Sequence, residues 1–237
     1  MDSATEVCKQ LRNRLSSVED DAFDLYYRRL VEARGRANLT SLRDRESIER
    51  RLFLESIVLL RTLEEAGVVW TPVIDIGTGA GIPGIPVKIV RPDLEMTLLE
   101  ATGKKARFVE ETVKELGLSD VQVIHGRAEE LAREQAHRES YALALARAVG
   151  PLRMLVELAL PFLRIGGCLA APKGSGAARE VREAAKALSE CGGTVESVRT
   201  LDMLGPGPKP TLVLVRKTAA TPERYPRRTG VPRKRPL

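Results

Sequence analysis

The sequence predicts an α/β protein in which a helical N-terminal extension precedes a mostly parallel, seven-stranded sheet. Up to residue 67, apolar residues recur at steps of three and four, as they do on one face of a helix. From residue 72 onward, short apolar runs alternate with longer amphipathic stretches, which is the pattern of repeated strand–helix–strand units. The last two apolar runs are separated only by the loop GPGPKP, which predicts an antiparallel hairpin at the sheet edge.

The extension, residues 1–67, is expected to hold two amphipathic helices, at 18–30 and 48–63. The sheet domain is expected to span 68–217, with a basic, proline-rich tail at 218–237. Strands are predicted at 72–76, 95–100, 121–124, 142–146, 167–171, 194–201 and 211–217. Helices are predicted at 82–91, 104–117, 127–138, 151–164 and 176–191.

The composition of the 237-residue chain is that of a folded protein, with 43% hydrophobic and 30% charged residues. No apolar stretch reaches the roughly 18 residues of a membrane span, and the polar start does not look like a secretory signal. The cysteines, Cys8, Cys168 and Cys191, have no CxxC spacing, so we expect neither a disulfide framework nor a metal site. These features favour a cytoplasmic protein.

Positive charge is concentrated at the C-terminus, where eight basic residues and one acidic residue follow position 215. The net charge of this segment therefore exceeds that of the whole chain, which is +6. Its four prolines are expected to keep it extended rather than helical. An extended basic arm indicates a polyanionic partner such as RNA, although a tail that only improves solubility would carry the same charge.

The segment DIGTGAGIPG follows the first predicted strand and has two interpretations. Gly79, Gly81 and Gly84 match the dinucleotide pattern G-x-G-x-x-G. Alternatively, the D-x-G-x-G-x-G loop that methyltransferases use for S-adenosylmethionine is formed by Asp75, Gly77, Gly79 and Gly81. Asp75 would repel a pyrophosphate but attract the ammonium and sulfonium groups of S-adenosylmethionine, so the methyl donor is favoured. A simple tight turn is the third alternative.

Residues after the next two strands are expected to complete an adenosine site. Glu100 ends the second strand, where its carboxylate can accept hydrogen bonds from both ribose hydroxyls. Arg127, Ala128 and Glu129 follow the third strand, at the place where an adenine would lie beside Ile82. These features suit NAD and S-adenosylmethionine equally.

The loop after the fourth strand, ARAVGP, lies where parallel α/β sheets open a crevice for substrates. It lacks the N/D-P-P-Y/F cluster that orients an amine and the Pro-Cys pair that attacks a pyrimidine carbon. Neither His125 nor His137 lies where a general base is expected, and we interpret both as structural or solvated. An acceptor with a free ring-nitrogen lone pair, such as guanine N7, fits because it needs only placement.

Two cations are predicted at this crevice, and no residue is predicted to act as an acid or base. Arg147 can clamp a phosphate or a guanine oxygen, or help to hold the cofactor. Lys173 follows the fifth strand and would add a second positive charge. The alternatives are that Arg147 pairs with Glu129 and that Lys173 is merely exposed.

Together these residues resemble the bacterial small-subunit ribosomal RNA guanine-N7 methyltransferases, also called glucose-inhibited division protein B. The matching stretches run from NLT at 38–40, through DIGTGAGIPGIPVKIVRP, LLEATGKKARFV, GRAEELA, ARAV and KG, to YPRRTGVP at 225–232. The resemblance implies a class I S-adenosylmethionine-dependent methyltransferase fold. It also implies that the substrate is a guanine of small-subunit RNA and the product 7-methylguanine.

By position, the resemblance implies cofactor contacts from Gly77, Ile82, Glu100, Ala101, Thr102, Ala128, Glu129 and Arg147. The sequence departs from the family pattern at Leu52, which replaces a His, at Ala146, which replaces a Ser, and at Glu100, which replaces an Asp. The lost His weakens any catalytic role for that position, while the other two changes conserve the chemistry.

The leading hypothesis is therefore methyl transfer by a cytoplasmic monomer to small-subunit RNA, free or in a 30S particle or assembly intermediate. The RNA phosphates are expected to contact Lys173 and the tail cations Arg227, Arg228, Arg233, Lys234 and Arg235. Deletion of 221–237 should weaken RNA binding and leave cofactor affinity intact. The alternatives are a non-catalytic RNA-binding or assembly factor and a dinucleotide-dependent oxidoreductase.

Overall fold

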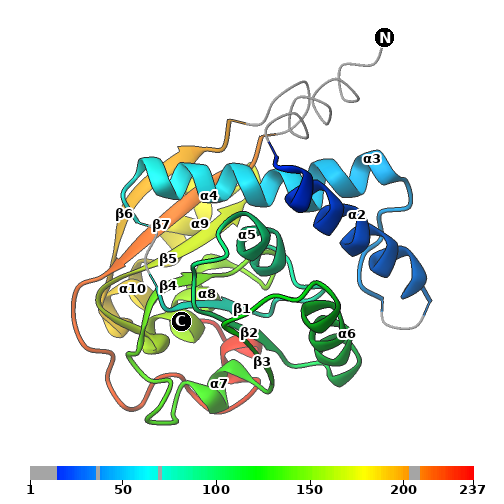
Figure 1. The fold of residues 1–237 in the computed structure, drawn as a ribbon. Helices are drawn as coiled ribbons and strands as arrows, with labels where there is room; N and C mark the ends of the chain where they lie inside the picture. The colour runs from blue at the N-terminus through cyan, green and yellow to red at the C-terminus, as the bar shows by residue number, and fades with distance from the viewer. Residues whose placement is uncertain (1–14, 36–37, 69–70, 203–208) are drawn as a thin grey trace.

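The computed structural model describes residues 15–35, 38–68, 71–202 and 209–237, which form one seven-stranded sheet with helices on both faces (Figure 1). The strands are β1 (Val73–Ile76), β2 (Met96–Glu100), β3 (Val121–His125), β4 (Tyr141–Leu145), β5 (Leu163–Lys173), β6 (Gly193–Thr200) and β7 (Thr211–Lys217). Their order across the sheet is β3-β2-β1-β4-β5-β7-β6. The first five strands are parallel, and β7 lies antiparallel between β5 and β6. The predicted sheet is confirmed, although most of the GPGPKP loop lies outside the described residues.

The N-terminal extension folds into α2 (Ser17–Glu32), α3 (Arg45–Ile48), the π-helical segment η1 (Glu49–Leu54) and α4 (Glu55–Glu65). The sheet domain carries α5 (Gly84–Val90), α6 (Gly103–Glu115), α7 (Ala128–Leu131), α8 (Leu152–Ala159), the 3₁₀ turn η2 (Leu160–Phe162), α9 (Ala177–Glu183) and α10 (Ala185–Cys191). A last helix, α11 (Val231–Lys234), lies near the C-terminus. None of the described helices is both long and apolar enough to cross a membrane.

Each face of the sheet has its own apolar core. One core joins the N-terminal helices, α5 and α6 to strand residues such as Leu143 and Leu214. The other joins α7, α8, α9 and α10 to strand residues such as Ala144 and Val213. Neighbouring strand residues thus alternate between the two cores, which explains why the strands appear in the sequence as nearly continuous apolar runs.

The direction of strand addition reverses between β1 and β4. From β1 the chain moves outward through β2 to β3, and it then returns to place β4 on the other side of β1. Ligands of open α/β sheets bind in the crevice outside the carboxyl ends of the strands at such a reversal. The loops that follow β1 and β4, which carry the glycine motif and Arg147, therefore meet at one place.

Two of the predicted helices are wrong at their C-terminal ends. The helix predicted at 127–138 stops at Leu131, and in the turns that follow Arg138 donates to main-chain carbonyls of the C-terminal segment. The helix predicted at 151–164 gives way to η2 and then to strand, because β5 begins at Leu163.

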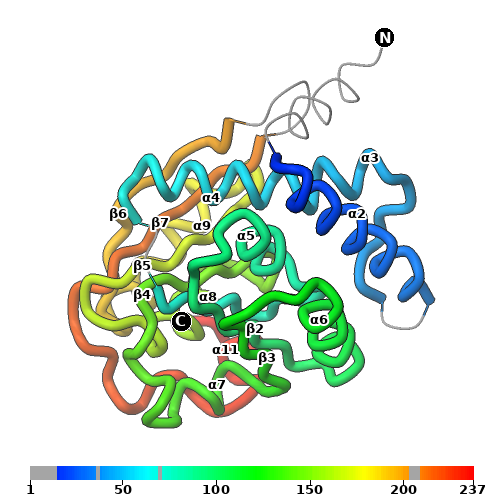
Figure 2. The backbone as a smooth tube through the Cα atoms, viewed as in Figure 1, coloured from blue at the N-terminus to red at the C-terminus, as the bar shows by residue number. Residues whose placement is uncertain are grey.

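The C-terminal segment, residues 218–237, is not the extended arm that its prolines predicted. It packs on the sheet face that carries α7 and α8, and α11 lies beside them (Figure 2). Pro232 lies in the first turn of α11, where a missing N–H removes no helical hydrogen bond. Tyr225 and Pro232 are buried, so the segment is packed into the fold rather than free of it.

Candidate functional site

The loop after β1 turns sharply because three of its glycines adopt a left-handed backbone. Gly77, Gly79 and Gly81 have φ values of +67°, +63° and +92°. A Cβ on Gly81 would lie 2.4 Å from the Cδ1 atom of Ile85, and a Cβ on Gly77 would lie 3.0 Å from a methyl group of Val149. Both the backbone angles and the close approaches therefore favour glycine at these positions.

Asp75 holds the two ends of this loop together from inside the protein. Its Oδ2 atom accepts a hydrogen bond from the Thr78 hydroxyl at 2.5 Å and another from the Gly84 N–H at 2.9 Å. No donor among the described residues reaches its Oδ1 atom. Complete burial raises the pKa of Asp75 to about 6, against the opposing effect of the two hydrogen bonds.

Glu100 joins the glycine loop to the end of β2. Its Oε2 atom accepts from the Gly79 N–H at 2.9 Å, and its Oε1 atom accepts from the Thr102 N–H at 2.7 Å. A carboxylate has about four acceptor positions, so each oxygen keeps one for a further donor. These contacts leave Glu100 the acceptor positions that its predicted role toward the ribose hydroxyls needs.

A cavity of about 260 Å³, here the glycine-loop cavity, opens at the carboxyl ends of β1, β2 and β3. The apolar residues of its lining include Leu99, Met154 and Leu158. The predicted cofactor residues that line it are Gly77, Ala101, Ala128 and Glu129. One residue that the sequence did not place here, Arg233 of α11, also lines it.

A second cavity of about 660 Å³, here the basic cavity, lies between the N-terminal helices and the ends of β4 and β5. Its cationic lining residues are Arg50, Arg51, Arg147, Lys173 and Lys209, and its acidic ones are Glu46, Glu55 and Glu180. The π-helical turn of η1 supplies Arg50 and Arg51, and π-helical turns are frequent at functional sites.

The two predicted crevice cations are both held in place. Arg147 Nη2 donates to the Arg51 carbonyl at 2.6 Å and to Glu55 Oε2 at 3.1 Å, so its acidic partner is Glu55 rather than Glu129. Lys173 Nζ contacts the Gly150 carbonyl at 2.6 Å and Glu180 at 3.0 Å. Its side chain is only 8% exposed, so Lys173 is not a solvated surface cation.

A family model described as rRNA small subunit methyltransferase G matches residues 19–204. The chain belongs to this family. It is 45% identical over 223 residues to ribosomal RNA small subunit methyltransferase G of Chloroflexus aggregans, which covers 94% of this chain and 92% of that protein. It is 39% identical over 229 residues to the protein of the same name from Desulfitobacterium hafniense, which covers 97% and 94%.

Among solved structures, the fold of this methyltransferase is shared by a SAM dependent methyltransferase from Aquifex aeolicus. The TM-score is 0.53 at 18% sequence identity, and the match covers 74% of this chain and 94% of that one. The predicted class I methyltransferase fold is confirmed. Membership of a methyltransferase family also decides between the two interpretations of the glycine motif, and the prediction of S-adenosylmethionine as cofactor is confirmed.

Several predicted residues of this methyltransferase line neither of the two cavities. Asp75, Gly79, Gly81, Ile82, Glu100 and Thr102 belong to this group. Neither cavity is lined by His125 or His137, and His137 hydrogen-bonds the Tyr141 hydroxyl at 2.7 Å. Leu52, the position of the lost family His, is 9% exposed and packs in the core.

Half of the basic residues that follow position 215 are paired within this methyltransferase. The four pairs are Arg216–Glu196, Lys217–Glu139, Arg224–Glu190 and Arg227–Glu157. Arg227 was predicted to contact RNA phosphates, but its guanidinium is committed to the fully buried carboxylate of Glu157. Arg228, Lys234 and Arg235 are exposed and form no ion pair among the described residues.

One contact to the glycine loop had no signal in the sequence. The Tyr26 hydroxyl of α2 donates to the Ala80 carbonyl at 2.5 Å across 54 residues of chain. Burial raises the pKa of Tyr26 well above its ordinary value, so the hydroxyl stays protonated and remains a donor. The helical extension therefore supports the loop directly.

Proposed function

We propose that this chain transfers the methyl group of S-adenosylmethionine to N7 of a guanine in small-subunit ribosomal RNA. The observation that carries the proposal is the loop after β4, which contributes to both cavities. Val149 lines the glycine-loop cavity, while Arg147, Ala148 and Gly150 line the basic cavity. A donor held in one cavity and a base held in the other would meet across this loop.

The residues around the glycine-loop cavity fit S-adenosylmethionine. The unpartnered Oδ1 atom of buried Asp75 suits a cationic group, and the two open acceptor positions of Glu100 suit a pair of ribose hydroxyls. The apolar lining from Leu99, Met154 and Leu158 suits an adenine ring. When bound, S-adenosylmethionine supplies an electrophilic methyl group on a positively charged sulfur.

The chain's own contribution to the chemistry is placement. Guanine N7 carries a free lone pair, so its methylation requires no general base, and alignment behind the methyl group supplies the catalysis. Arg147 is held by Glu55 and the Arg51 carbonyl, which leaves further N–H groups of its guanidinium for a phosphate or a guanine oxygen. Arg147 is thus the candidate for positioning the substrate.

The basic cavity suits the RNA itself. Five cations against three acids give it a positive balance, and phosphate contacts from Lys and Arg account for much of the affinity of RNA-binding proteins. The target base must be unpaired or splayed out to enter, because folded RNA hides its base edges. We also propose that the protein acts as a monomer in the cytoplasm, and that its substrate is a 30S subunit or an assembly intermediate.

The proposal is tested by incubating the protein with tritiated S-adenosylmethionine and small subunits that lack this methylation, followed by digestion of the RNA to nucleosides. The expected product is labelled 7-methylguanosine. Label in another nucleoside would contradict the acceptor atom. Cofactor and RNA binding without transfer to free RNA, intermediate or subunit would favour a non-catalytic assembly factor. The Arg147→Lys variant should bind cofactor but turn over far more slowly, since lysine cannot reproduce the fixed guanidinium fork.

A further inference from the structure

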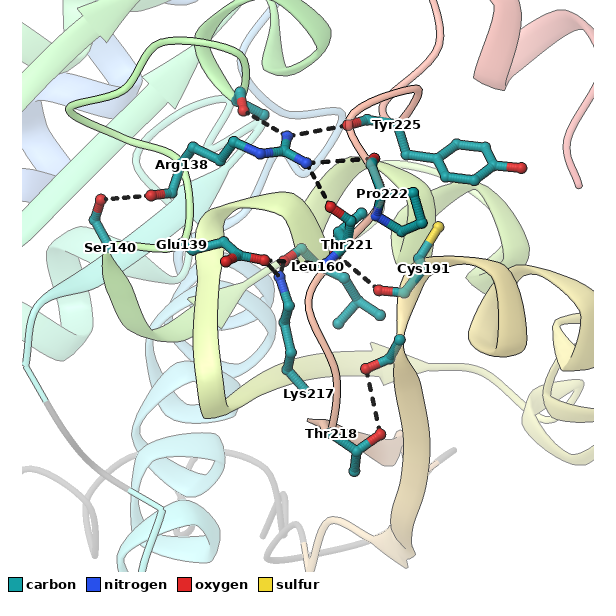
Figure 3. A network of polar contacts seen from close by, with 12 residues as sticks. Arg138, Glu139, Ser140, Leu160, Cys191, Lys217, Thr218, Thr221, Pro222 and Tyr225 are labelled. Atoms are coloured by element: carbon teal, nitrogen blue, oxygen red, sulfur yellow. Dashed lines mark hydrogen bonds and ion pairs between the residues drawn. The ribbon is translucent and has the colours of Figure 1, made fainter.

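The C-terminal segment is fastened to the domain by polar contacts around Arg138 and Glu139 (Figure 3). Arg138 donates to the main-chain carbonyls of Thr221 at 2.7 Å and Tyr225 at 3.0 Å. Glu139 Oε1 accepts from Lys217 Nζ at 2.6 Å and from the Thr221 N–H at 3.0 Å. Lys217 is fully buried, and these contacts together give the start of the segment a defined position.

Farther along, the segment contacts both walls of the glycine-loop cavity. On one side, Arg227 forms a two-pronged pair with Glu157, at 2.8 Å from Nε to Oε1 and 2.6 Å from Nη2 to Oε2. Glu157 lies on α8, which also supplies Met154 to the cavity. On the other side, the Gly230 N–H donates to Glu129 Oε1 at 2.9 Å. The segment therefore ties α8 to α7, which carries Glu129.

These contacts bring Arg233 to the cavity, where it lies among lining residues such as Ala101 and Ala128. Within the described parts of the chain, the Arg233 guanidinium forms no hydrogen bond or ion pair, in contrast to that of Arg227. We propose that the C-terminal segment forms the outer wall of the cofactor site and that Arg233 contacts the adenosine moiety of S-adenosylmethionine. This inference deepens the proposed function and rests on its methyl donor.

The chemistry of the two groups is complementary. Adenine presents an aromatic face and ring-nitrogen acceptors, and a guanidinium can stack on the face or donate to the nitrogens. The positive charges of S-adenosylmethionine lie on its sulfur and amino group, whereas its adenosine end is neutral. A cation at the adenosine end therefore opposes no charge of the ligand.

The inference changes what deletion of the tail should do. Sequence alone predicted that loss of 221–237 leaves cofactor affinity intact, on the view that the tail serves only RNA. If the segment is a wall of the site, loss of 231–237 weakens cofactor binding even without RNA, while the contacts of Arg138 and the Gly230 N–H remain.

The test compares Arg233→Ala with Lys234→Ala in the full chain, by calorimetric titration with S-adenosylmethionine and with adenosine in the absence of RNA. Lys234 is the matched control, because it is the next cation of α11 and does not line the cavity. For Arg233→Ala, Kd should rise about threefold to tenfold for both ligands, the range expected of one cation contact. For Lys234→Ala, Kd should stay within about twofold. Unfolding midpoints without ligand should match the wild type in both variants.

Equal affinities in the two variants would overturn the inference. So would an Arg233→Ala variant that loses RNA affinity and salt dependence while its cofactor affinity is unchanged, because Arg233 would then be a phosphate contact. The 1–230 truncation supports the inference if its cofactor Kd rises as in Arg233→Ala. Failure of the proposed function can be distinguished from failure of this inference. In that case the wild-type protein would bind S-adenosylmethionine but would form no 7-methylguanosine.

Discussion

The N-terminal helices and the C-terminal segment both cover the sheet domain, but they do so with different contacts. The N-terminal helices bury aromatic rings, whereas the C-terminal segment buries ion pairs. Phe23 and Tyr26 of α2 pack on Phe53 with ring centroids 5.1 and 5.2 Å apart. The C-terminal segment instead depends on Lys217 and on the Arg227–Glu157 pair, of which Lys217 and Glu157 are fully buried.

The difference predicts how each end of the chain tolerates change. Apolar packing adapts to similar shapes, so its cost follows the volume that a substitution removes. Substitution of one partner of a buried ion pair is strongly destabilising, because it leaves an uncompensated charge in the interior. Two carboxyl groups of the sheet domain have pKa values that shift in opposite directions. Burial raises the pKa of Asp75 on β1, whereas at Glu139 the contacts with Lys217 and Thr221 outweigh burial and lower the pKa.

The largest effect is expected from Arg227→Ala in the C-terminal segment. The substitution removes the guanidinium from the fully buried Glu157 carboxylate and leaves it only the main-chain N–H of residue 227, which should lower the free energy of unfolding by about 3–5 kcal/mol. Arg228→Ala is the matched control, since Arg228 is exposed, and it should change stability by less than about 0.5 kcal/mol. Urea denaturation of the two variants measures the difference. Similar midpoints would mean that ion pairs do not dominate docking of this segment.

A second test uses the raised pKa of Asp75. A folded-state pKa of about 6, above the ordinary 3.8, means that the folded protein holds this proton more tightly than the unfolded chain. The associated stability is complete below pH 4 and is lost as the pH rises through about 6. Asp75→Asn mimics the protonated acid. Its free energy of unfolding, relative to that of the wild type, should therefore rise by roughly 3 kcal/mol between pH 4 and pH 7.

Urea denaturation across that pH range checks the Asp75 prediction. A constant difference between Asp75→Asn and the wild type would contradict the raised pKa. The same variant should bind S-adenosylmethionine more weakly at pH 7, because it has lost the carboxylate charge proposed to face a cationic group of the cofactor.

The smallest effect is expected from Tyr26→Phe in the N-terminal helices. The ring packing is kept, but the Ala80 carbonyl loses its donor, which should cost about 1–2 kcal/mol of stability. Tyr27→Phe is the control on the same helix, because no hydrogen bond joins the Tyr27 hydroxyl to another described residue. Cofactor affinity should also fall in Tyr26→Phe alone, since Ala80 belongs to the glycine loop. Equal cofactor affinity in both variants would mean that the contact of the N-terminal extension with the glycine loop does not affect cofactor binding.

Much of the fold and part of the site follow from local patterns. The strand predicted at 95–100 differs from β2 by one residue, and that predicted at 211–217 matches β7, because apolar runs bounded by turns are a short-range signal. The glycine loop is also local, since the positive φ angles of Gly77 and Gly79 are available mainly to glycine. An adenosine-containing ligand could therefore be predicted from the residues of this loop and of the strand that follows it.

Local patterns carry no signal for contacts with a distant partner. The helix predicted at 127–138 ends at Leu131, and in the turns that follow Arg138 donates to carbonyls more than 80 residues away. Arg227 was predicted to contact RNA phosphates, and its ion-pair partner, Glu157, lies 70 residues earlier in the chain. Composition counts each charge but contains no record of its neighbours.

The sequence by itself determined the order of strands and helices, the glycine turn and the family, because periodicity, backbone freedom and motif spacing are properties of neighbouring residues. Only the tertiary structure decided that Arg147 pairs with Glu55, that Tyr26 supports the glycine loop and that Arg233 lies at the cofactor cavity. Each of these contacts joins segments far apart in the chain. The physical reason is that hydrogen bonds and ion pairs act over a few ångströms, and folding alone decides which distant groups come within that range.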